Sequence, residues 1–361
     1  MPAMLRSSAA RAIAVVALFL SSSAIAQVPV VLKVHHFLPS GSTTHAKLLV
    51  PWCERIDKES AGRMKCQLYP SMQLGGTPPQ LFDQARDGIA DIVWTLPGYT
   101  AGRFPRMEVF ELPFMIGDAE AASKAAWEFY DKHARDEFRE VKPLAVHVHD
   151  AGYLHTRDRQ VRTLADFRGL KLRAPTRQTN RLLAALGATP VSMPVTGLAD
   201  AMSKGVIDGA VIPWEVVPAV KVQEIARFHT ETDPNTAAMY TAVFLLAMNR
   251  KTYDGLPPDL RAVIDRNSGL VLSGQAGRLW EEQKAPARKL ALDRGNTVYV
   301  VPATELSLWQ EAAQPVLLDW VRDMAKRGAD GDTLLADARA LIARHAKSAS
   351  PASTMDAAPR K

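Results

Sequence analysis

The sequence contains only two cysteines, Cys53 and Cys66, among its 361 residues. Two cysteines at this spacing, without a matching pair of histidines, make a weak zinc site. After the first 26 residues, no stretch approaches the about 18 uninterrupted apolar residues that a membrane-spanning helix needs. The composition therefore gives no support to a zinc-stabilised fold or to an integral membrane protein.

The sequence also lacks the short motifs of several enzyme classes. It has no GxSxG nucleophile motif, no GxxxxGK phosphate loop, no GxGxxG dinucleotide motif and no HExxH zinc motif. We therefore expect no cofactor, and a catalytic function would have to rest on some other activated group.

The amino terminus has the three-part layout of a secretory signal peptide. Arg6 and Arg11 precede an apolar run over 12–20, and the small-residue site Ala24-Ile25-Ala26 follows. The prediction is a signal peptide over 1–26 that is cleaved after Ala26 and leaves about 335 residues, enough for two domains. The cleavage point has no cysteine to which a lipid anchor could be attached. We therefore expect a soluble, periplasmic product.

The mature chain has a small positive charge. Lys and Arg number 44 and Asp and Glu 38, so removal of Arg6 and Arg11 leaves 42 − 38, or +4. The positive residues are spread along the chain and interleaved with acids, which is typical of a solvated surface and not of a nucleic-acid-binding stripe.

Both cysteines lie in the exported part of the chain. An oxidising compartment favours a disulfide between Cys53 and Cys66, which would stabilise the fold by roughly 3 kcal/mol in the chain-entropy model. The alternative is a pair of buried free thiols.

Short apolar segments alternate with helix-like segments in the first half of the mature chain. Strands are expected over 30–36, 64–69 and 90–94, with a helix in each interval, which is half of a doubly wound α/β domain. The loop 95–100 would then lie at the carboxyl edge of the strands, where such sheets bind ligands.

Other segments predict how the domains are joined. We expect a long helix over 119–140, a strand over 144–149 that enters the second domain, a helix over 214–222 and an apolar crossing segment over 240–249. Residues 347–361 are rich in Ala, Ser and Pro without periodicity, so a disordered tail is expected there.

The stretch 166–213 repeats the strand–helix alternation and contains the first candidate for a ligand-binding residue. Arg173 ends a short apolar strand and precedes a helix that begins near Thr176. A guanidinium beside a helix amino terminus can hold a carboxylate through two parallel hydrogen bonds. The alternative, a surface salt bridge to Asp166 or Asp208, is equally compatible with the residues alone.

Several aromatic side chains fall at strand ends or in the loops after them, namely Phe37, Trp94, Tyr99 and Trp214. Core packing is the simpler interpretation of each one alone. Several at one edge of a two-domain protein would suit a pocket for an apolar or aromatic ligand.

The nine histidines include a pair that could chelate a metal. His147 and His149 are two residues apart on a strand and so point to one face. Hydrogen-bonded histidines at a strand end are the simpler interpretation, because no acidic or cysteine partner has a recognisable spacing. The alternative function is an exported metal-dependent hydrolase that uses His147, His149 and His36.

The order of several short motifs resembles one known family, the DctP-type solute-binding proteins of tripartite ATP-independent periplasmic (TRAP) transporters. The motifs are HHFLP at 35–39, the Tyr-Pro to Leu-Gly segment at 69–75, DGIADI at 87–92, LPF at 112–114, LADFRGLKLR at 164–173, LGATP at 186–190 and GVIDG at 205–209. Each motif is weak, but together they cover nearly the whole mature chain.

This resemblance implies a fold and a domain organisation. The fold class is α/β, the two-domain periplasmic-binding-protein (Venus flytrap) fold with crossing strands and a long connecting helix. The first domain would span 27–149, with parts of the C-terminal region returning to it, and the second 150–240. A crossing strand and C-terminal helices would follow over 241–346.

The resemblance also implies a function. The protein would capture a small carboxylate and deliver it to the membrane permease subunits of a TRAP transporter, without catalysis and without a metal. Gene neighbours would distinguish a permease from a membrane sensor as the partner. Arg173 corresponds to the family's carboxylate clamp. The other expected ligand-binding residues are Thr176, Trp214, Ile212, Thr95, Trp94, Tyr99, Phe37, His36 and His155.

Two departures from the family pattern narrow the expected ligand. Where family members often carry an asparagine after the Asp208-Gly209 pair, this chain has an apolar run that reaches Trp214. The second arginine of sialic-acid binders is absent from the segment 152–155. We therefore expect a monocarboxylate with an apolar body, such as an aromatic or branched 2-oxo or 2-hydroxy acid.

Overall fold

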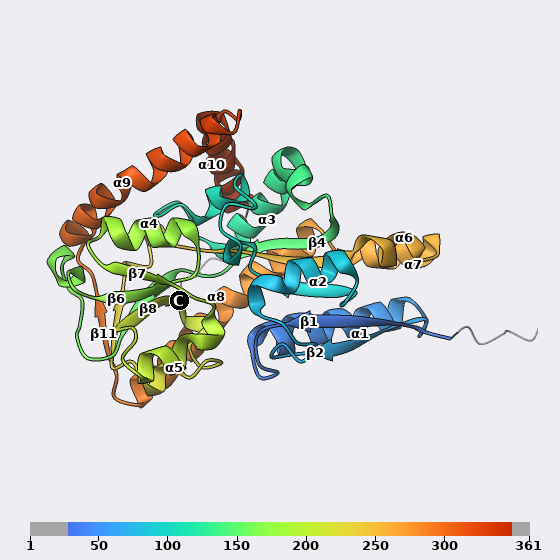
Figure 1. The fold of residues 1–361 in the computed structure, drawn as a ribbon, viewed down its shortest axis with the longest axis horizontal. Coiled ribbons are helices and arrows are strands. Elements are labelled where there is room, and N and C mark those ends of the chain that lie inside the picture. The colour runs from blue at the N-terminus through green and yellow to red at the C-terminus, as the bar shows by residue number, and fades with distance from the viewer. Residues whose placement is uncertain (1–27, 349–361) are drawn as a thin grey trace, which may run out of the picture.

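The computed structural model describes residues 28–348, which form two β-sheets with helices packed around them (Figure 1). The first sheet has the strand order β2-β1-β3-β10-β4. Its strands are β1 (Val30–His36), β2 (Met64–Tyr69), β3 (Ile92–Thr95), β4 (Val141–Val148) and β10 (Val243–Asn249). β1 pairs in parallel with β2 and β3, as the alternating pattern predicts, whereas β10 is antiparallel to both of its neighbours.

The second sheet has the order β11-β9-β5-β8-β6-β7. Its strands are β5 (Gly152–Thr156), β6 (Lys171–Ala174), β7 (Thr189–Ser192), β8 (Gly209–Pro213), β9 (Phe228–Glu231) and β11 (Thr297–Val300). β6 is parallel to β7 and β8, and β5 is antiparallel to β8 and β9.

The chain crosses between the sheets and leaves one antiparallel strand in each. β5 follows β4 of the first sheet directly, and β10 returns to the first sheet after β9 of the second. This is the two-domain α/β architecture with crossing strands that the sequence predicts.

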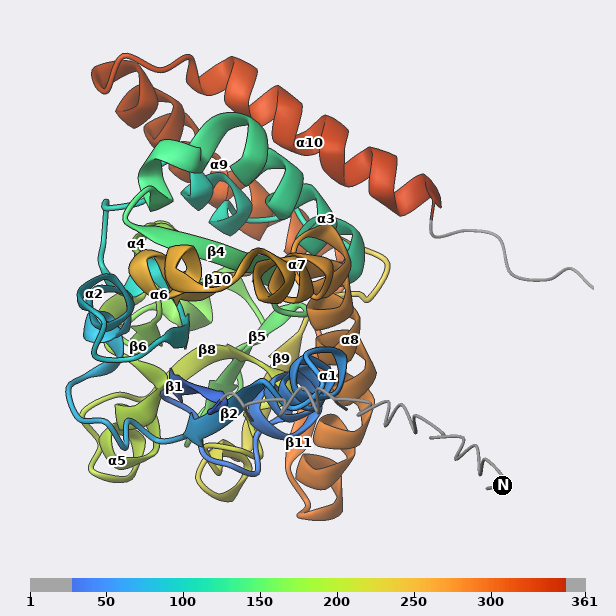
Figure 2. The same cartoon turned by 90° about the vertical axis from the view of Figure 1, so that its right-hand side faces the viewer.

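Ten α-helices cover the sheets of the described residues. They are α1 (Val50–Glu59), α2 (Leu81–Asp87), α3 (Ala119–Phe129), α4 (Arg177–Ala185), α5 (Leu198–Ser203), α6 (Arg250–Gly255), α7 (Pro258–Arg266), α8 (Leu270–Asp293), α9 (Ala303–Lys326) and α10 (Gly331–Ser348). α8 contacts α3 and β4 in the first domain and the turn after β8 in the second, so it connects the domains. α9 packs on α4 and α10 on α3, and together they run along the outside (Figures 1 and 2).

Local sequence explains where α4 begins and ends. The Thr176 hydroxyl accepts a hydrogen bond from the Thr179 N–H at the start of the helix. Gly187, at φ +95°, lets the chain turn back toward β7. Leu182 and Leu183 of α4 are buried and hold the helix against the domain core. The helix therefore stays directly after the strand that carries Arg173.

Two expected helices are shorter than the sequence suggested. α3 ends at Phe129, and the chain leaves helical geometry at Ala134 (φ −131°), which lets Phe138 stack on Phe104 at 4.7 Å. The predicted helix over 214–222 is only a 3-10 turn over Trp214–Val216 followed by irregular turns. Pro218 has no N–H to donate to the carbonyl of residue 214, so a regular helix cannot continue there.

The ends of the chain fall partly outside the described residues. The predicted signal peptide and most of the predicted tail are not among residues 28–348. α10 continues to Ser348, so residues 347 and 348 are helical and do not belong to a disordered tail.

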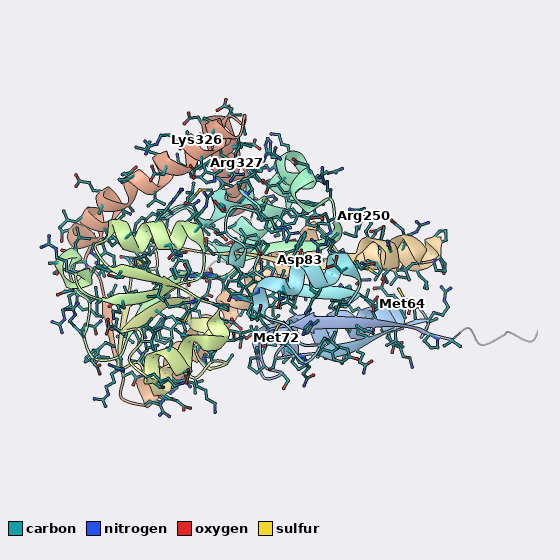
Figure 3. The ribbon with its side chains drawn as sticks, viewed as in Figure 1. Met64, Met72, Asp83, Arg250, Lys326 and Arg327 are labelled. Carbon is teal, nitrogen blue, oxygen red and sulfur yellow. A yellow bond between two sulfur atoms is a disulfide. The ribbon has the colours of Figure 1, made fainter. Side chains whose placement is uncertain are left out.

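The carboxyl ends of the parallel strands in the first sheet face the second domain. Met64 at the start of β2 lies at the outer end of the molecule, whereas Met72, just beyond the end of β2, lies beside the second domain (Figure 3). Buried apolar side chains of both domains form one continuous cluster, which includes Trp94 of β3 and Val195 before α5. The two domains are therefore closed against each other.

Candidate ligand-binding site

Arg173 lies in β6 and is almost completely buried, with 2% of its surface exposed. Its Nε donates to the Met193 carbonyl at 2.9 Å and its Nη1 to the Val211 carbonyl at 3.3 Å, while Nη2 lies 3.5 Å from the Tyr99 hydroxyl. Among residues 28–348, no carboxylate forms an ion pair with it. The structure thus holds a buried cation without a counter-ion.

The two acids considered as partners of Arg173 have other roles. One oxygen of Asp166 accepts hydrogen bonds from the Arg162 and Thr163 N–H groups, and one oxygen of Asp208 accepts from the Lys171 N–H at 2.7 Å. The surface salt bridge is therefore not what holds Arg173.

A mostly apolar cavity lies between the domains and contains the Arg173 guanidinium. The space between its lining atoms, with the open solvent at its mouth included, is about 410 Å³. Its lining residues are Phe37, Leu38, Trp94, Leu96, Tyr99, His149, Arg173, Pro175, Val195, Ile212, Pro213, Glu215, Val216, Tyr240, Ala242, Phe244 and Trp280.

Stacked aromatic rings form the first-domain wall of this cavity. Trp94 lies parallel to Phe244, with ring centroids 4.6 Å apart, and Phe37 packs against Trp94 at 4.9 Å. The Trp94 Nε1–H donates to the Nε2 of His147 at 3.0 Å. The wall is therefore packed and its indole N–H is satisfied without a ligand.

Five of the ten expected ligand-binding residues meet at this cavity: Arg173, Ile212, Trp94, Tyr99 and Phe37. The other five lie outside it, namely Thr176, Trp214, Thr95, His36 and His155. Thr95 is buried in β3, and Thr176 lines an adjoining surface cleft that shares Tyr99 and Pro175 with the cavity.

Trp214, His36 and His155 are engaged by hydrogen bonds elsewhere. The Trp214 indole N–H donates to Glu231 at 2.6 Å in the interior of the second domain. His36 Nε2 lies 2.9 Å from His45 Nδ1, and His155 bridges the Ile212 carbonyl and His229. Each of these side chains therefore points away from the cavity toward its own domain.

The histidine pair considered for metal binding is held by ordinary hydrogen bonds. His147 accepts from Trp94 and donates from Nδ1 to the Val148 carbonyl, and His149 donates to the Asp150 carbonyl. Burial lowers the pKa of His147 to about 4 and that of His149 to about 3, so both rings are neutral at pH 7. Over residues 28–348 no group of three His, Cys, Asp or Glu side chains is arranged to hold a metal.

Sequence reasoning missed several lining residues. Glu215 is the second residue after β8, and its position just past a strand end was a usable signal. Tyr240, Phe244 and Trp280 come from the crossing segment, β10 and α8. Only the tertiary fold brings these three to the cavity.

The polar contacts that join the domains around the cavity include the following three. The Val195 N–H donates to the Tyr99 hydroxyl at 3.0 Å, and Arg177 forms an ion pair with Glu108. Glu215 accepts hydrogen bonds from the hydroxyl and N–H of Thr43. These contacts fix the closed arrangement in which Arg173 is buried.

A fourth group at the interface is held neutral by its surroundings. Burial, followed by the nearby Glu108 carboxylate, raises the pKa of Glu111 to about 8. Its Oε1 is 3.3 Å from the Val243 N–H, and its Oε2 has no partner among the described residues.

Cys53 and Cys66 form the predicted disulfide, which joins α1 to β2. No helix of the described residues is both long and apolar enough to cross a membrane.

Comparisons with known proteins identify close structural relatives. A TRAP solute-binding protein from Rhodoferax ferrireducens, crystallised with copurified benzoate, is 53% identical with a TM-score of 0.88, over 89% of this chain and 100% of that one. A marine-metagenome TRAP solute-binding protein specific for aromatic acids, in complex with 3-hydroxybenzoate, is 45% identical with a TM-score of 0.86, over 88% and 99%. One from Bordetella bronchiseptica with bound mandelate is 30% identical with a TM-score of 0.81, over 88% and 99%.

The sequence profile of DctP, described as bacterial extracellular solute-binding protein, family 7, matches residues 34–323. This match covers most of the chain and includes the strands and helices that build the cavity. The chain therefore belongs to the DctP family and is a TRAP-type solute-binding protein.

Proposed function

We propose that the protein binds a small aromatic monocarboxylate and delivers it to the membrane subunits of a TRAP transporter. The observation that carries the proposal is the buried Arg173 guanidinium, which has no carboxylate partner among the described residues and opens into an aromatic cavity. A carboxylate would supply the missing negative charge through charge-assisted hydrogen bonds. A ring attached to it would pack against Trp94 and Phe37.

The relatives support the same ligand class. Benzoate, 3-hydroxybenzoate and mandelate, the acids found in three of them, each carry one carboxylate on an aromatic body. In this chain Arg173 is the one cationic side chain of the cavity lining, which suits a single carboxylate.

The direct test is a thermal-shift screen of purified protein with organic acids. Benzoate, phenylacetate and mandelate should raise the unfolding temperature, since a ligand at a hundred times its Kd adds about 2.7 kcal/mol of stability. Malate, galacturonate and sialic acid serve as controls. A shift with those controls and none with the aromatic acids would overturn the proposal.

We also propose that binding is the whole function and that the domains move as hinged bodies. The predicted division at residues 149 and 150 falls between β4 and β5, where the chain changes sheets. Ligand contacts from both domains would then select the closed state. Small-angle scattering should show a smaller radius of gyration with benzoate than without it, and an unchanged radius would contradict the hinge.

We also propose that the protein is exported and that its signal peptide is removed. Cleavage after Ala26 would place the mature protein in the periplasm with the permease. Mass spectrometry of the protein from a periplasmic extract should find Gln27 as the first residue, and a retained leader in that fraction would contradict this cleavage site.

A further inference from the structure

Glu215 leaves one hydrogen-bonding atom unmatched on the wall of the ligand cavity. The side chain is 4% exposed and lies in the 3-10 turn directly after β8. The carboxyl group accepts from the Thr43 hydroxyl and N–H, while its Oε1 is recorded without a partner among residues 28–348. A buried carboxyl oxygen without a partner is costly, so an unpaired oxygen in a ligand cavity indicates a ligand group that pairs with it.

Glu215 lies four residues further along the chain than the carbonyl that Arg173 contacts. In the β6–β8 pairing Arg173 is opposite Ala210, and its Nη1 donates to the Val211 carbonyl. From Val211 to Glu215 the chain continues through the end of β8 and one 3-10 turn, which is roughly 10 Å of backbone. Arg173 and Glu215 are therefore two polar residues of the same cavity lining that come from different elements.

The other polar side chains of the lining are His149, Tyr99 and Tyr240, and both tyrosines lie near Arg173. Phe37 has no hydrogen-bonding group, and the Trp94 N–H is already used by His147. A ligand that packs its ring on the aromatic wall and gives its carboxylate to Arg173 would direct the opposite side of the ring toward Glu215.

We propose that the ligand carries a hydroxyl group on the side of its ring away from the carboxylate, and that Glu215 forms a hydrogen bond with that hydroxyl. The inference rests on the aromatic-acid function proposed above and narrows it to hydroxylated acids of benzoate size. An ionised Glu215 accepts the hydrogen bond, and a protonated one donates it to the hydroxyl oxygen. A methyl group in the same place can do neither.

Glu215 also couples recognition of the ring hydroxyl to closure of the two domains. Thr43 belongs to the first domain and Glu215 to the second, so the carboxyl group contacts Thr43 and the hydroxyl together only when the domains are closed. An acid without the hydroxyl would close the domains and leave Oε1 unpaired.

The test is isothermal titration calorimetry of wild-type protein at pH 8 with a series of benzoates. Benzoate, 3- and 4-hydroxybenzoate, 3- and 4-methylbenzoate and 2-hydroxybenzoate are the probes. We expect the 3- or the 4-hydroxy acid to bind roughly 10- to 100-fold more tightly than benzoate and than its methyl analogue. The 2-hydroxy acid should gain nothing, because its hydroxyl lies beside the carboxylate.

The outcomes separate this inference from the function on which it rests. If no benzoate binds, the aromatic-acid function is wrong, and this inference with it. If benzoate binds and neither the 3- nor the 4-hydroxyl improves affinity over the matching methyl group, the function stands and the role of Glu215 is overturned.

Two variants assign the effect to the side chain. Glu215→Leu should abolish the preference for the hydroxyl, so that the hydroxy and methyl acids bind within about threefold of each other. Thr43→Val is the matched control, since it removes a hydroxyl bonded to Glu215 and should weaken all the acids by a similar factor. A hydroxyl preference that survives Glu215→Leu would contradict the assignment. If that variant does not fold, the wild-type series decides.

Discussion

The two sides of the ligand cavity differ in whether they are complete without a ligand. On the first-domain side, Phe37, Trp94 and Phe244 pack against one another and belong to the hydrophobic core. On the second-domain side, within residues 28–348, Arg173 has no counter-ion and Glu215 has an unpaired oxygen. The difference teaches that one wall is maintained by folding, whereas the other holds polar groups that lack a charge or hydrogen-bond partner among residues 28–348.

The largest expected effect is the loss of Trp94. Trp94→Ala should lower the free energy of unfolding by about 3–5 kcal/mol, because it leaves a cavity in the core. It should also weaken the binding of benzoate, since the same ring forms the wall. Urea unfolding followed by circular dichroism, together with calorimetry, measures both quantities.

A second tryptophan provides the matched control for Trp94. Trp309 is also buried, but it packs on Phe167 in the other apolar cluster and does not line the cavity. Trp309→Ala should cost similar stability and leave the benzoate Kd of the folded protein unchanged. A Trp94→Ala variant of wild-type stability would contradict the view that this wall is part of the core.

Arg173 should show the opposite behaviour. Arg173→Met should weaken benzoate binding by about 2–5 kcal/mol, the usual effect of removing one partner of a buried charge pair. The unfolding temperature without ligand should stay the same or rise, because a buried cation without a counter-ion is replaced by an apolar side chain. Thermal unfolding with and without benzoate measures both.

Arg168→Met is the control for Arg173. Its side chain is exposed on the same domain, so the variant should keep the wild-type shift with benzoate. If Arg173→Met still responded to benzoate, the carboxylate would have to bind elsewhere in the cavity.

The position of Arg173 at the cavity could be predicted because the signal is local. A short apolar strand, an arginine at its end and a helix start at Thr176 are adjacent in the chain, and parallel sheets bind ligands at that edge. The other wall could be predicted only in part. Phe37 and Trp94 stand at strand ends, whereas Phe244 and Trp280 reach the cavity from a crossing strand and a distant helix.

Trp214 shows how a local rule fails. Ile212 and Trp214 are two residues apart, so strand periodicity places both on the cavity side. The chain leaves the strand after Pro213 and forms a 3-10 turn, which ends the alternation. Trp214 then donates its N–H to Glu231, and Glu215 takes the place at the cavity.

Acid should lower the stability of the folded protein through His147, which contacts Trp94 in the aromatic wall. Its pKa is about 4 in the folded protein, because of burial, and about 6.5 when unfolded. As the pH falls from 6.5 to 4 the unfolded chain takes up a proton that the folded protein does not, so stability is lost in that window. The loss from this residue should be at most about 3 kcal/mol.

Comparison with a variant isolates His147 from other titrating groups. His147→Gln cannot be protonated, so the stability difference between wild type and variant should shift in favour of the variant as the pH falls from 6.5 to 4. Urea unfolding at several pH values measures this difference. A difference independent of pH would mean that His147 does not link the aromatic side to acid.

The smallest expected effect comes from Gly98, where the first domain touches the second. A Cβ at this position would lie 2.6 Å from the Thr176 Cγ2 and 3.0 Å from the Glu111 Oε1. Gly98→Ala should therefore hold the domains slightly apart and weaken all acids by about tenfold, or about 1.4 kcal/mol. Gly117→Ala is the control, because a Cβ there meets no atom within 4 Å.

Calorimetry with benzoate and 4-hydroxybenzoate shows what Gly98→Ala changes. Unchanged affinity for both acids would mean that the loop yields and the contact does not limit closure. An equal loss for the two acids would show that the first domain contributes closure and packing without distinguishing them. An unequal loss would show that the ring hydroxyl is recognised only when the domains close completely, because Glu215 then depends on its contact with Thr43.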